Sequence, residues 1–356
     1  MLQKELERRK VPKIAFPADE SGRRERREEI KTVLCRELYG FAPDFPLTDE
    51  SVILRKEENA FGGKAVACEI DVRVRSPFNY ASFRAQLVVP KGIKKVPMFL
   101  CYTFTPAIAD GCGEELIDNG YAIASLYYEG VAPDKPDDHL LGAGRFCRRN
   151  PYDSWGKIAI WAWAGSRLLD YILARNQTEA VIDEQRIAVV GHSRLGKTAL
   201  FAGAMDERYS MVISNDSGAG GIALYRGKRG ERLTNLAGKG SRLWFCGNML
   251  NWVDREEELP YDANYLAALI APRHLYVASA TEDDWADPQS EFLSCVAASE
   301  AWESYGLTGL VSPDRYPEPN EAFHDGCIGY HLRKGTHYMG RDDWHRFMEY
   351  RARHNV

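Results

Sequence analysis

Residues 187–200 read IAVVGHSRLGKTAL and form the most informative stretch of the chain. Its first four residues are apolar and mostly β-branched, which predicts a short buried strand, and residues 195–205 predict a helix. Ser193 therefore lies at a sharp turn between strand and helix, where a nucleophilic serine can meet a base and a substrate. Gly191 and Gly196 fit this geometry, because a side chain at either position would collide as strand and helix close on each other. The pattern is typical of a nucleophile elbow, although the usual G-x-S-x-G places its second glycine one residue earlier.

The same residues also match a phosphate-binding loop. Residues 191–198 fit G-x-x-x-x-G-K-[ST] at every position, and that loop too follows a strand and opens a helix. Residues 211–216 could then be the acidic strand that holds magnesium. This stretch alone leaves two chemistries open: acyl transfer through Ser193, and nucleotide binding that involves Lys197.

The composition is that of a globular protein with a sizeable core. Of the 356 residues, 45% are hydrophobic and 27% are charged, and the formal net charge is −5. No basic run indicates nucleic acid binding, no apolar run is long enough to span a membrane, and the charged first residues do not resemble a secretory signal. The eight cysteines are scattered without a C-x-x-C pair, which favours reduced thiols in a cytoplasmic protein. We expect no metal and no cofactor, because no His and Cys positions have ligand spacing; the oligomeric state is left open.

The order of the predicted elements indicates an α/β fold with one domain over residues 1–356. Residues 1–45 predict a polar helical arm, and antiparallel strands follow at residues 51–54, 65–74 and 85–90. Strands and helices then alternate, which predicts a mainly parallel sheet covered by helices on both faces, a three-layer sandwich. The later strands are expected at residues 97–104, 121–128, 187–190, 211–216, 274–280 and 327–332, and the later helices at residues 155–175, 195–206, 289–305 and 341–354.

Two loops late in the chain supply the other groups that a serine hydrolase needs, in the order serine, acid, histidine found in α/β-hydrolases. Asp283 lies in an acidic segment directly after the strand predicted at residues 274–280. His337 lies between the last predicted strand and the last helix, and His324, in a loop before that strand, is the rival base. A phosphate-binding loop usually follows the first strand of its sheet, whereas several predicted strands precede residue 187. The sequence therefore favours the hydrolase over the nucleotide-binding protein.

Residues 191–197, GHSRLGK, resemble the G-C-S-R-x-G-K signature of carbohydrate esterase family 15, the glucuronoyl esterases. The late second glycine belongs to that family's own pattern. The resemblance extends from about residue 152 to the C-terminus, and the first 150 residues match loosely. The other matching segments are WAW at 161–163, DSGAGG at 216–221, LIAPR at 269–273, EDDWADP at 282–288, GTH at 335–337 and DW at 343–344.

Two positions depart from the family pattern. His192 stands where many members have Cys; because it precedes the nucleophile, we expect its side chain to point into the sheet and activity to tolerate it. Asp216 stands where fungal members carry a Glu that serves as the triad acid.

The fold and the resemblance together imply the catalytic roles. Ser193 is the expected nucleophile, and His337 is the base that takes its proton and then protonates the leaving alcohol. Asp283 is the expected acid that orients His337, with Asp216 as the alternative or assisting acid. The nearby Asp284 and Asp287 we interpret as loop or cap carboxylates.

The segment after the nucleophile is expected to stabilise the oxyanion and bind substrate. The backbone N–H of Arg194 faces the developing oxyanion, and the resemblance adds its guanidinium to that hole. The resemblance also implies that Lys197, one turn later on the same helix face, holds sugar hydroxyls together with Glu231. Trp285 would contact the sugar ring; simple core packing is the alternative for this side chain.

The sequence therefore predicts a serine carboxylic-ester hydrolase that acts on a small carbohydrate ester. The resemblance implies cleavage of 4-O-methyl-glucuronate esters, and an acetyl-xylan esterase-type deacetylase is the alternative. The alternatives from other classes are a phosphate-loop nucleotide-binding protein and a catalytically silent carbohydrate binder.

Overall fold

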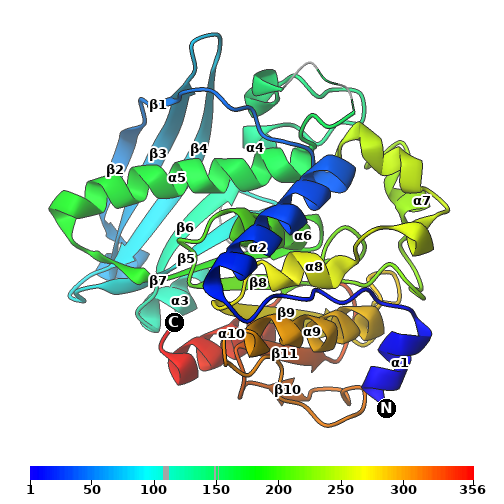
Figure 1. Ribbon diagram of the computed structural model, residues 1–356. Helices are drawn as coiled ribbons and strands as arrows, with labels where there is room; N and C mark the ends of the chain where they lie inside the picture. Colours follow the sequence, from blue (N-terminus) through cyan, green and yellow to red (C-terminus); the bar gives the residue numbers. More distant parts are fainter. Residues whose placement is uncertain (107–111, 148–149, 151) are drawn as a thin grey trace.

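One mixed sheet organises the part of the chain that the structure describes, which is residues 1–106, 112–147, 150 and 152–356 of a computed structural model. Its strands lie in the spatial order β1-β3-β4-β6-β5-β7-β8-β9-β11-β10, with β2 beside β3 (Figure 1). The strands are β1 (Thr48–Asp49), β2 (Val52–Ala60), β3 (Ala65–Arg75), β4 (Tyr80–Pro90), β5 (Val96–Thr103), β6 (Ala122–Tyr127), β7 (Ile182–His192), β8 (Met211–Asn215), β9 (His274–Ala280), β10 (Ala322–Phe323) and β11 (Ile328–Arg333).

The centre of the sheet is parallel and its first edge is antiparallel. Strands β6, β5, β7, β8, β9 and β11 all run in one direction, whereas β1 to β4 pair antiparallel and β10 closes the far edge antiparallel. This is the mainly parallel sheet predicted from the alternation of strands and helices. The carboxyl ends of the parallel strands meet at one edge of the sheet, so the loops that follow them gather there.

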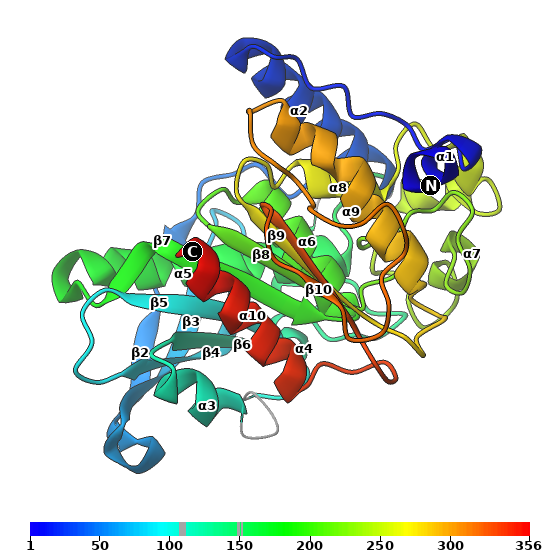
Figure 2. The same cartoon turned by 90° about the horizontal axis from the view of Figure 1, so that it is seen from below.

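Helices cover both faces of the sheet, as Figure 2 shows from below. Along β5 successive side chains face opposite layers, as a strand requires: the Phe99 ring lies 5.4 Å from that of Trp344 in α10, and the Tyr102 hydroxyl donates to Ala162 O of α5 at 3.1 Å. The helices are α1 (Leu2–Arg8), α2 (Glu20–Leu34), α3 (Cys112–Asp118), α4 (Tyr128–Val131), α5 (Lys157–Glu179), α6 (Arg194–Met205), α7 (Leu233–Leu236), α8 (Ala263–Ala268), α9 (Pro288–Glu303) and α10 (Arg341–His354).

The N-terminal arm, predicted to be polar, packs against the rest of the molecule through buried apolar side chains and through one buried arginine. Ile14, Ile30 and Leu34 are fully buried or nearly so. The buried guanidinium of Arg27 in α2 donates to Ala271 O at 2.8 Å and to Leu269 O at 2.9 Å. The arm thus covers the segment just before β9.

Several short elements differ from the prediction. The segment expected to be a loop at residues 105–113 leads into α3 at Cys112, with residues 107–111 outside the described part of the chain. The long loop expected between β8 and β9 contains α7 and α8. Helices of four to six residues are too short to display a helical period in the sequence.

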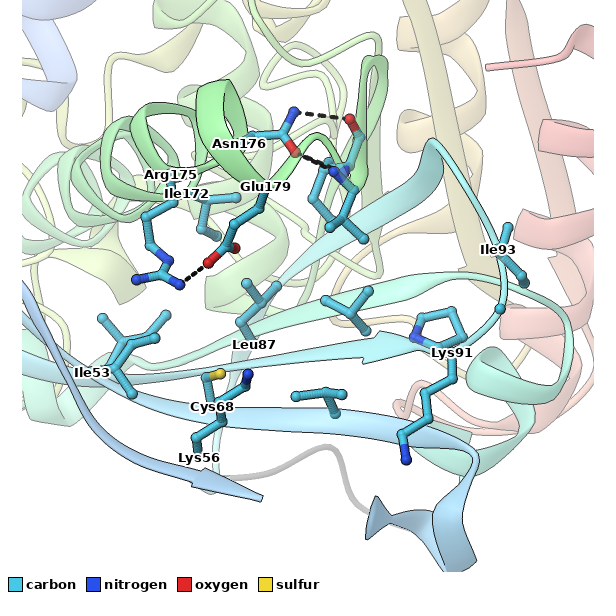
Figure 3. Close-up of a pocket in the computed structure, with 17 residues that line it drawn as sticks. Ile53, Lys56, Cys68, Leu87, Lys91, Ile93, Ile172, Arg175, Asn176 and Glu179 are labelled. Carbon is cyan, nitrogen blue, oxygen red and sulfur yellow. Dashed lines mark hydrogen bonds and ion pairs between the residues drawn. The ribbon is translucent and has the colours of Figure 1, made fainter. Parts of the chain in front are cut away.

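A cavity of about 480 Å³ lies between α5 and strands β2 to β4 (Figure 3). Its walls include the aliphatic side chains of Ile53, Leu87 and Ile172, and an Arg175–Glu179 ion pair lies beside it. Ile182 also lines it, so the cavity lies at the start of β7, the opposite end of that strand from Ser193. Among the helices in the described residues, none has the length and apolar character needed to cross a bilayer.

Candidate active site

Ser193 occupies a strained turn between β7 and α6. Its backbone has φ 57° and ψ −128°, a conformation that costs a side-chain-bearing residue roughly 1–3 kcal/mol, and its N–H donates to Asn215 O at 2.8 Å. A Cβ on Gly191 would lie 2.0 Å from Leu195 O, and one on Gly196 would lie 2.8 Å from Asn215 O. The close approach expected of these two glycines is therefore present, and it forces Ser193 out of the turn.

His337 and Asp283 lie beside this serine. His337 Nε2 is 2.9 Å from Ser193 Oγ, and His337 Nδ1 is 2.5 Å from Asp283 Oδ2. Asp283 follows β9 and His337 follows β11, so the two loops predicted from the sequence meet at the edge of the sheet. Burial tends to raise the pKa of Asp283, but hydrogen bonds from His337 and the Ala286 N–H outweigh it and hold that pKa below its usual value. A charged carboxylate therefore orients the imidazole.

His324, the rival base, lies elsewhere. Its Nε2 is 2.7 Å from the Tyr276 hydroxyl, in a buried contact. The structure therefore places His337, and not His324, at Ser193.

Asp216 approaches the site but does not bond to His337. Its side chain is buried, and neither carboxylate oxygen accepts a hydrogen bond from the described residues. The nearest cationic group is Arg333, whose Nη2 lies 3.7 Å from Asp216 Oδ2. Burial, followed by the negative charges of Glu291 and Asp283, raises the pKa of Asp216 well above its usual value. Asp216, Asp283 and His337 each bring one donor atom within 4.8 Å of the others, so of the described residues these are the ones that could meet around a metal ion.

Arg194 is held by two residues that the sequence analysis missed. Its Nη1 donates to Asp134 Oδ2 at 2.5 Å, and its guanidinium lies 4.7 Å from the centre of the Trp244 ring. Trp244 Nε1 donates in turn to Asp134 Oδ1 at 2.8 Å. Asp134 lies in a Pro- and Asp-rich loop and Trp244 in a long irregular segment, and no motif spacing links either of them to Ser193.

Lys197 and Glu231 form a buried ion pair next to this group. Lys197 Nζ is 2.8 Å from Glu231 Oε2 and donates to Ser217 O at 2.8 Å. In a phosphate-binding loop the lysine would face the nucleotide, whereas here its ammonium is already paired. The structure therefore gives no support to the nucleotide-binding alternative.

Trp285 is exposed, with 53% of its surface accessible, so the alternative of core packing is wrong. Its carbonyl accepts from the Glu231 N–H at 2.8 Å, which ties the Trp285 loop to the ion pair. Asp287 caps α9 by accepting from the Ser290 N–H, as expected of a cap carboxylate, and Asp284 is exposed.

Glu291 is a further buried acid that the sequence analysis did not identify. It accepts from the Gly218 N–H at 2.9 Å and from Ser279 Oγ at 2.6 Å. It thereby links α9 to β9 and to the glycine-rich segment after Asp216. Burial raises its pKa to about 7, even though both hydrogen bonds oppose that rise.

His192 is largely buried on the α10 face of the sheet, but unlike the expectation it also contacts the site. Its ring lies beside the site, 4.5 Å from the ring of His337 between centroids. Its Nδ1 lies within hydrogen-bonding distance of Asn215 Oδ1, at the end of β8.

The fold and the site together define an α/β-hydrolase. A serine at a strand–turn–helix elbow bonds to a histidine that an aspartate orients. The sheet is mainly parallel, and the three residues follow the chain order Ser193, Asp283, His337. A family model described as glucuronyl esterase of fungi matches residues 72–306. The chain belongs to the glucuronoyl esterase family.

Individual relatives agree with this assignment. The carbohydrate esterase MZ0003 from an unknown prokaryotic organism is 32% identical over 92% of this chain and 84% of its own length. A 4-O-methyl-glucuronoyl methylesterase of Phanerochaete carnosa is 28% identical, and the match covers 76% of this chain and 65% of that enzyme. The structure of a glucuronoyl esterase from Solibacter usitatus superposes with a TM-score of 0.85 at 31% identity, over 96% of both chains.

Proposed function

We propose that this chain hydrolyses esters of 4-O-methyl-glucuronate by a serine mechanism. The observation that carries the proposal is the hydrogen-bonded line from Ser193 Oγ through His337 to Asp283, with distances of 2.9 and 2.5 Å. The relatives named as glucuronoyl esterases support the choice of substrate.

In the first half of the reaction, Ser193 Oγ attacks the ester carbonyl and His337 Nε2 takes the serine proton. Asp283 stabilises the imidazolium that forms, because it is charged and already bonded to Nδ1. His337 then gives the proton to the departing alcohol. Water hydrolyses the acyl-enzyme with His337 as the base again.

Charge that develops on the carbonyl oxygen is stabilised by Arg194. Its backbone N–H lies directly after the nucleophile at the start of α6, and its guanidinium is held in place by Asp134 and Trp244. Donors fixed before the reaction lower the barrier by roughly 3 kcal/mol each.

The sugar binds beside the ion pair of Lys197 and Glu231, whose polar atoms suit hydroxyl groups, and against the exposed ring of Trp285. The pair is buried and tied to the Trp285 loop, so it offers the hydroxyls a fixed geometry. For the cellular compartment we keep the cytoplasm as our proposal, on the scattered cysteines of the sequence.

The test is the kcat/KM of the purified protein on a panel of esters: methyl 4-O-methyl-glucuronate, acetylated xylan and a feruloyl ester. We expect the uronate ester to be preferred by at least about tenfold, because a site that pairs its polar groups with a carbohydrate leaves them unpaired with other acyl groups. Equal or better turnover of acetylated xylan would instead favour the deacetylase. Ser193→Ala is the control for background hydrolysis.

A further inference from the structure

The residue before the nucleophile packs against the imidazole that serves it. The His192 and His337 rings are 4.5 Å apart between centroids, with 44° between their planes. His337 lies on a loop with 40% of its side chain exposed, whereas the His192 side chain is 13% exposed. A half-exposed catalytic ring therefore packs against a largely buried one.

Asn215 fixes the orientation of the His192 ring. His192 Nδ1 lies 2.5 Å from Asn215 Oδ1, and the amide nitrogen of Asn215 faces Asp343 Oδ1 at 3.4 Å. Because that amide donates toward the carboxylate, its oxygen is the acceptor for His192, and the His192 proton is on Nδ1. The backbone oxygen of Asn215 also accepts from the Ser193 N–H at 2.8 Å, so one residue holds both the nucleophile turn and the ring.

Asp343 connects this ring to the backbone on either side of His337. It accepts from Arg333 Nε at 3.3 Å. Arg333 Nη2 donates to Thr336 O at 2.9 Å and to Tyr338 O at 2.7 Å, the carbonyls that flank His337. The Asp343 carboxylate therefore contacts both Asn215, which bonds to His192, and Arg333, which bonds to the loop that carries His337.

His192 carries no charge beside His337 at neutral pH. Burial and then the neighbouring His337 lower the pKa of His192 to about 4. The negative charges of Asp343 and Asp283 act in the opposite direction, and Asp216 Oδ2 lies 4.0 Å away, without reversing the shift. A neutral ring can support His337 without repelling the imidazolium that forms during the reaction.

We propose that His192 is a positioning residue: its ring packs against His337 and holds His337 Nε2 at Ser193 Oγ. The proposal rests on the roles given to Ser193 and His337 under the proposed function. It replaces the sequence-based expectation that activity is indifferent to the side chain at this position.

Three variants separate the ring from its hydrogen bond. His192→Phe keeps a ring against His337 without the donor to Asn215, His192→Gln keeps a donor without the ring, and His192→Cys removes both. We expect kcat to fall by about tenfold in the Gln and Cys variants with KM changed by less than about twofold, because small misplacements of a catalytic group act on the chemical step. His192→Phe is expected to retain kcat within about threefold.

The second readout is the rate at which a fluorophosphonate labels Ser193. This rate depends on the serine and its base, and it does not require the sugar substrate to bind. It should follow the order of the kcat values. Across pH 5–8 the Gln and Cys variants should lose activity by a constant factor, because His192 is neutral throughout that range. Tyr276→Phe is the matched control. Its hydroxyl bonds to His331 Nδ1 at 3.0 Å, and His331 Nε2 lies 2.9 Å from Asp343 Oδ1, so Tyr276 belongs to the same buried network without bonding to His337. The melting temperature of this variant should fall while kcat stays unchanged.

Wild-type kcat and labelling in His192→Gln and His192→Cys would overturn the proposal, as would an equal loss in all three variants. If the wild-type protein labels but turns over no uronate ester, the proposed substrate fails and the labelling rates still decide the role of His192. If the wild-type protein does not label, both proposals fail.

Discussion

Asp283 and Asp216 are both buried acids near His337, and their different contacts assign them different roles. Asp283 shares a hydrogen bond of 2.5 Å with His337 Nδ1, which keeps its pKa low. Asp216 accepts no hydrogen bond from the described residues, and burial raises its pKa well above the usual value. A charged acid therefore steadies the imidazole, and beside it lies a second acid whose ionised form is disfavoured by burial.

Replacing these acids one at a time tests that division. Asp283→Asn should lower kcat on a uronate ester by about 10³–10⁴, because the amide cannot stabilise the imidazolium and favours the wrong tautomer. Asp216→Asn should cost less than about tenfold, since neither carboxylate oxygen of Asp216 bonds to His337. Steady-state kinetics decide, with melting temperatures to show that both variants fold. Retained activity in the Asp283 variant with loss in the Asp216 variant would reverse the assignment.

The residues of the site that sequence can predict are those that directly follow strands. Ser193, Asp283 and His337 each lie just past a parallel strand, so the fold alone brings them together. Asp134 and Trp244 act from irregular segments, and only tertiary packing places them on Arg194. The contact of His192 with His337 was not predicted, because the alternation of side chains along β7 assigns His192 to the face of Val190 but does not identify its neighbours from other loops.

At the scale of elements, the strand–helix joint of β7 and α6 leaves no space for a side chain at its first glycine. A Cβ on Gly191 would lie 2.0 Å from the backbone oxygen of Leu195, which belongs to α6 and cannot move alone. The joint therefore holds the nucleophile through steric contact as well as through hydrogen bonds.

Gly191→Ala should lower the melting temperature by several degrees and reduce labelling of Ser193 by a fluorophosphonate, because overpacking costs roughly 1–3 kcal/mol and shifts the turn. Gly240→Ala is the matched control, since nothing lies within 4 Å of the added Cβ and its φ is not positive. Differential scanning fluorimetry and labelling measure the two effects. A Gly191 variant as stable and reactive as the Gly240 variant would contradict the steric account.

Long periodic elements were predictable, and edge or short elements were not. Helices α5, α9 and α10 lie within a few residues of their predicted ranges, because their apolar faces repeat over several turns. Strand β2 continues to Ala60 although its prediction ended at residue 54, because it is an edge strand with exposed polar residues on both faces.

For the molecule as a whole, Glu291 makes stability depend on pH. Its pKa is raised from 4.5 to about 7 in the folded protein. Between these two pH values the carboxyl group is therefore protonated in the native state and ionised in the unfolded chain. The free energy of unfolding therefore falls as pH rises between these two values and is flat above them.

Glu291→Gln should remove this dependence. The melting temperature of the variant relative to the wild-type protein should rise by about 2 °C or more between pH 5 and pH 8. Glu303→Gln, an exposed position on the same helix α9, should show no such trend. If the melting temperatures of the Glu291 variant and the wild-type protein changed in parallel with pH, Glu291 would be ionised in the native state across that range.

Strands β8 and β9 are neighbours, and each delivers a carboxylate toward one imidazole, with donor atoms of Asp216, Asp283 and His337 within 4.8 Å of one another. The histidine therefore has two acids within a short distance, only one of which bonds to it in this structure. If the aspartate after β9 were lost, a side chain longer by one methylene at position 216 would bring its carboxylate closer to the histidine. Natural variation at these two positions is therefore expected to be compensatory, with a glutamate after β8 accompanying the loss of the aspartate after β9.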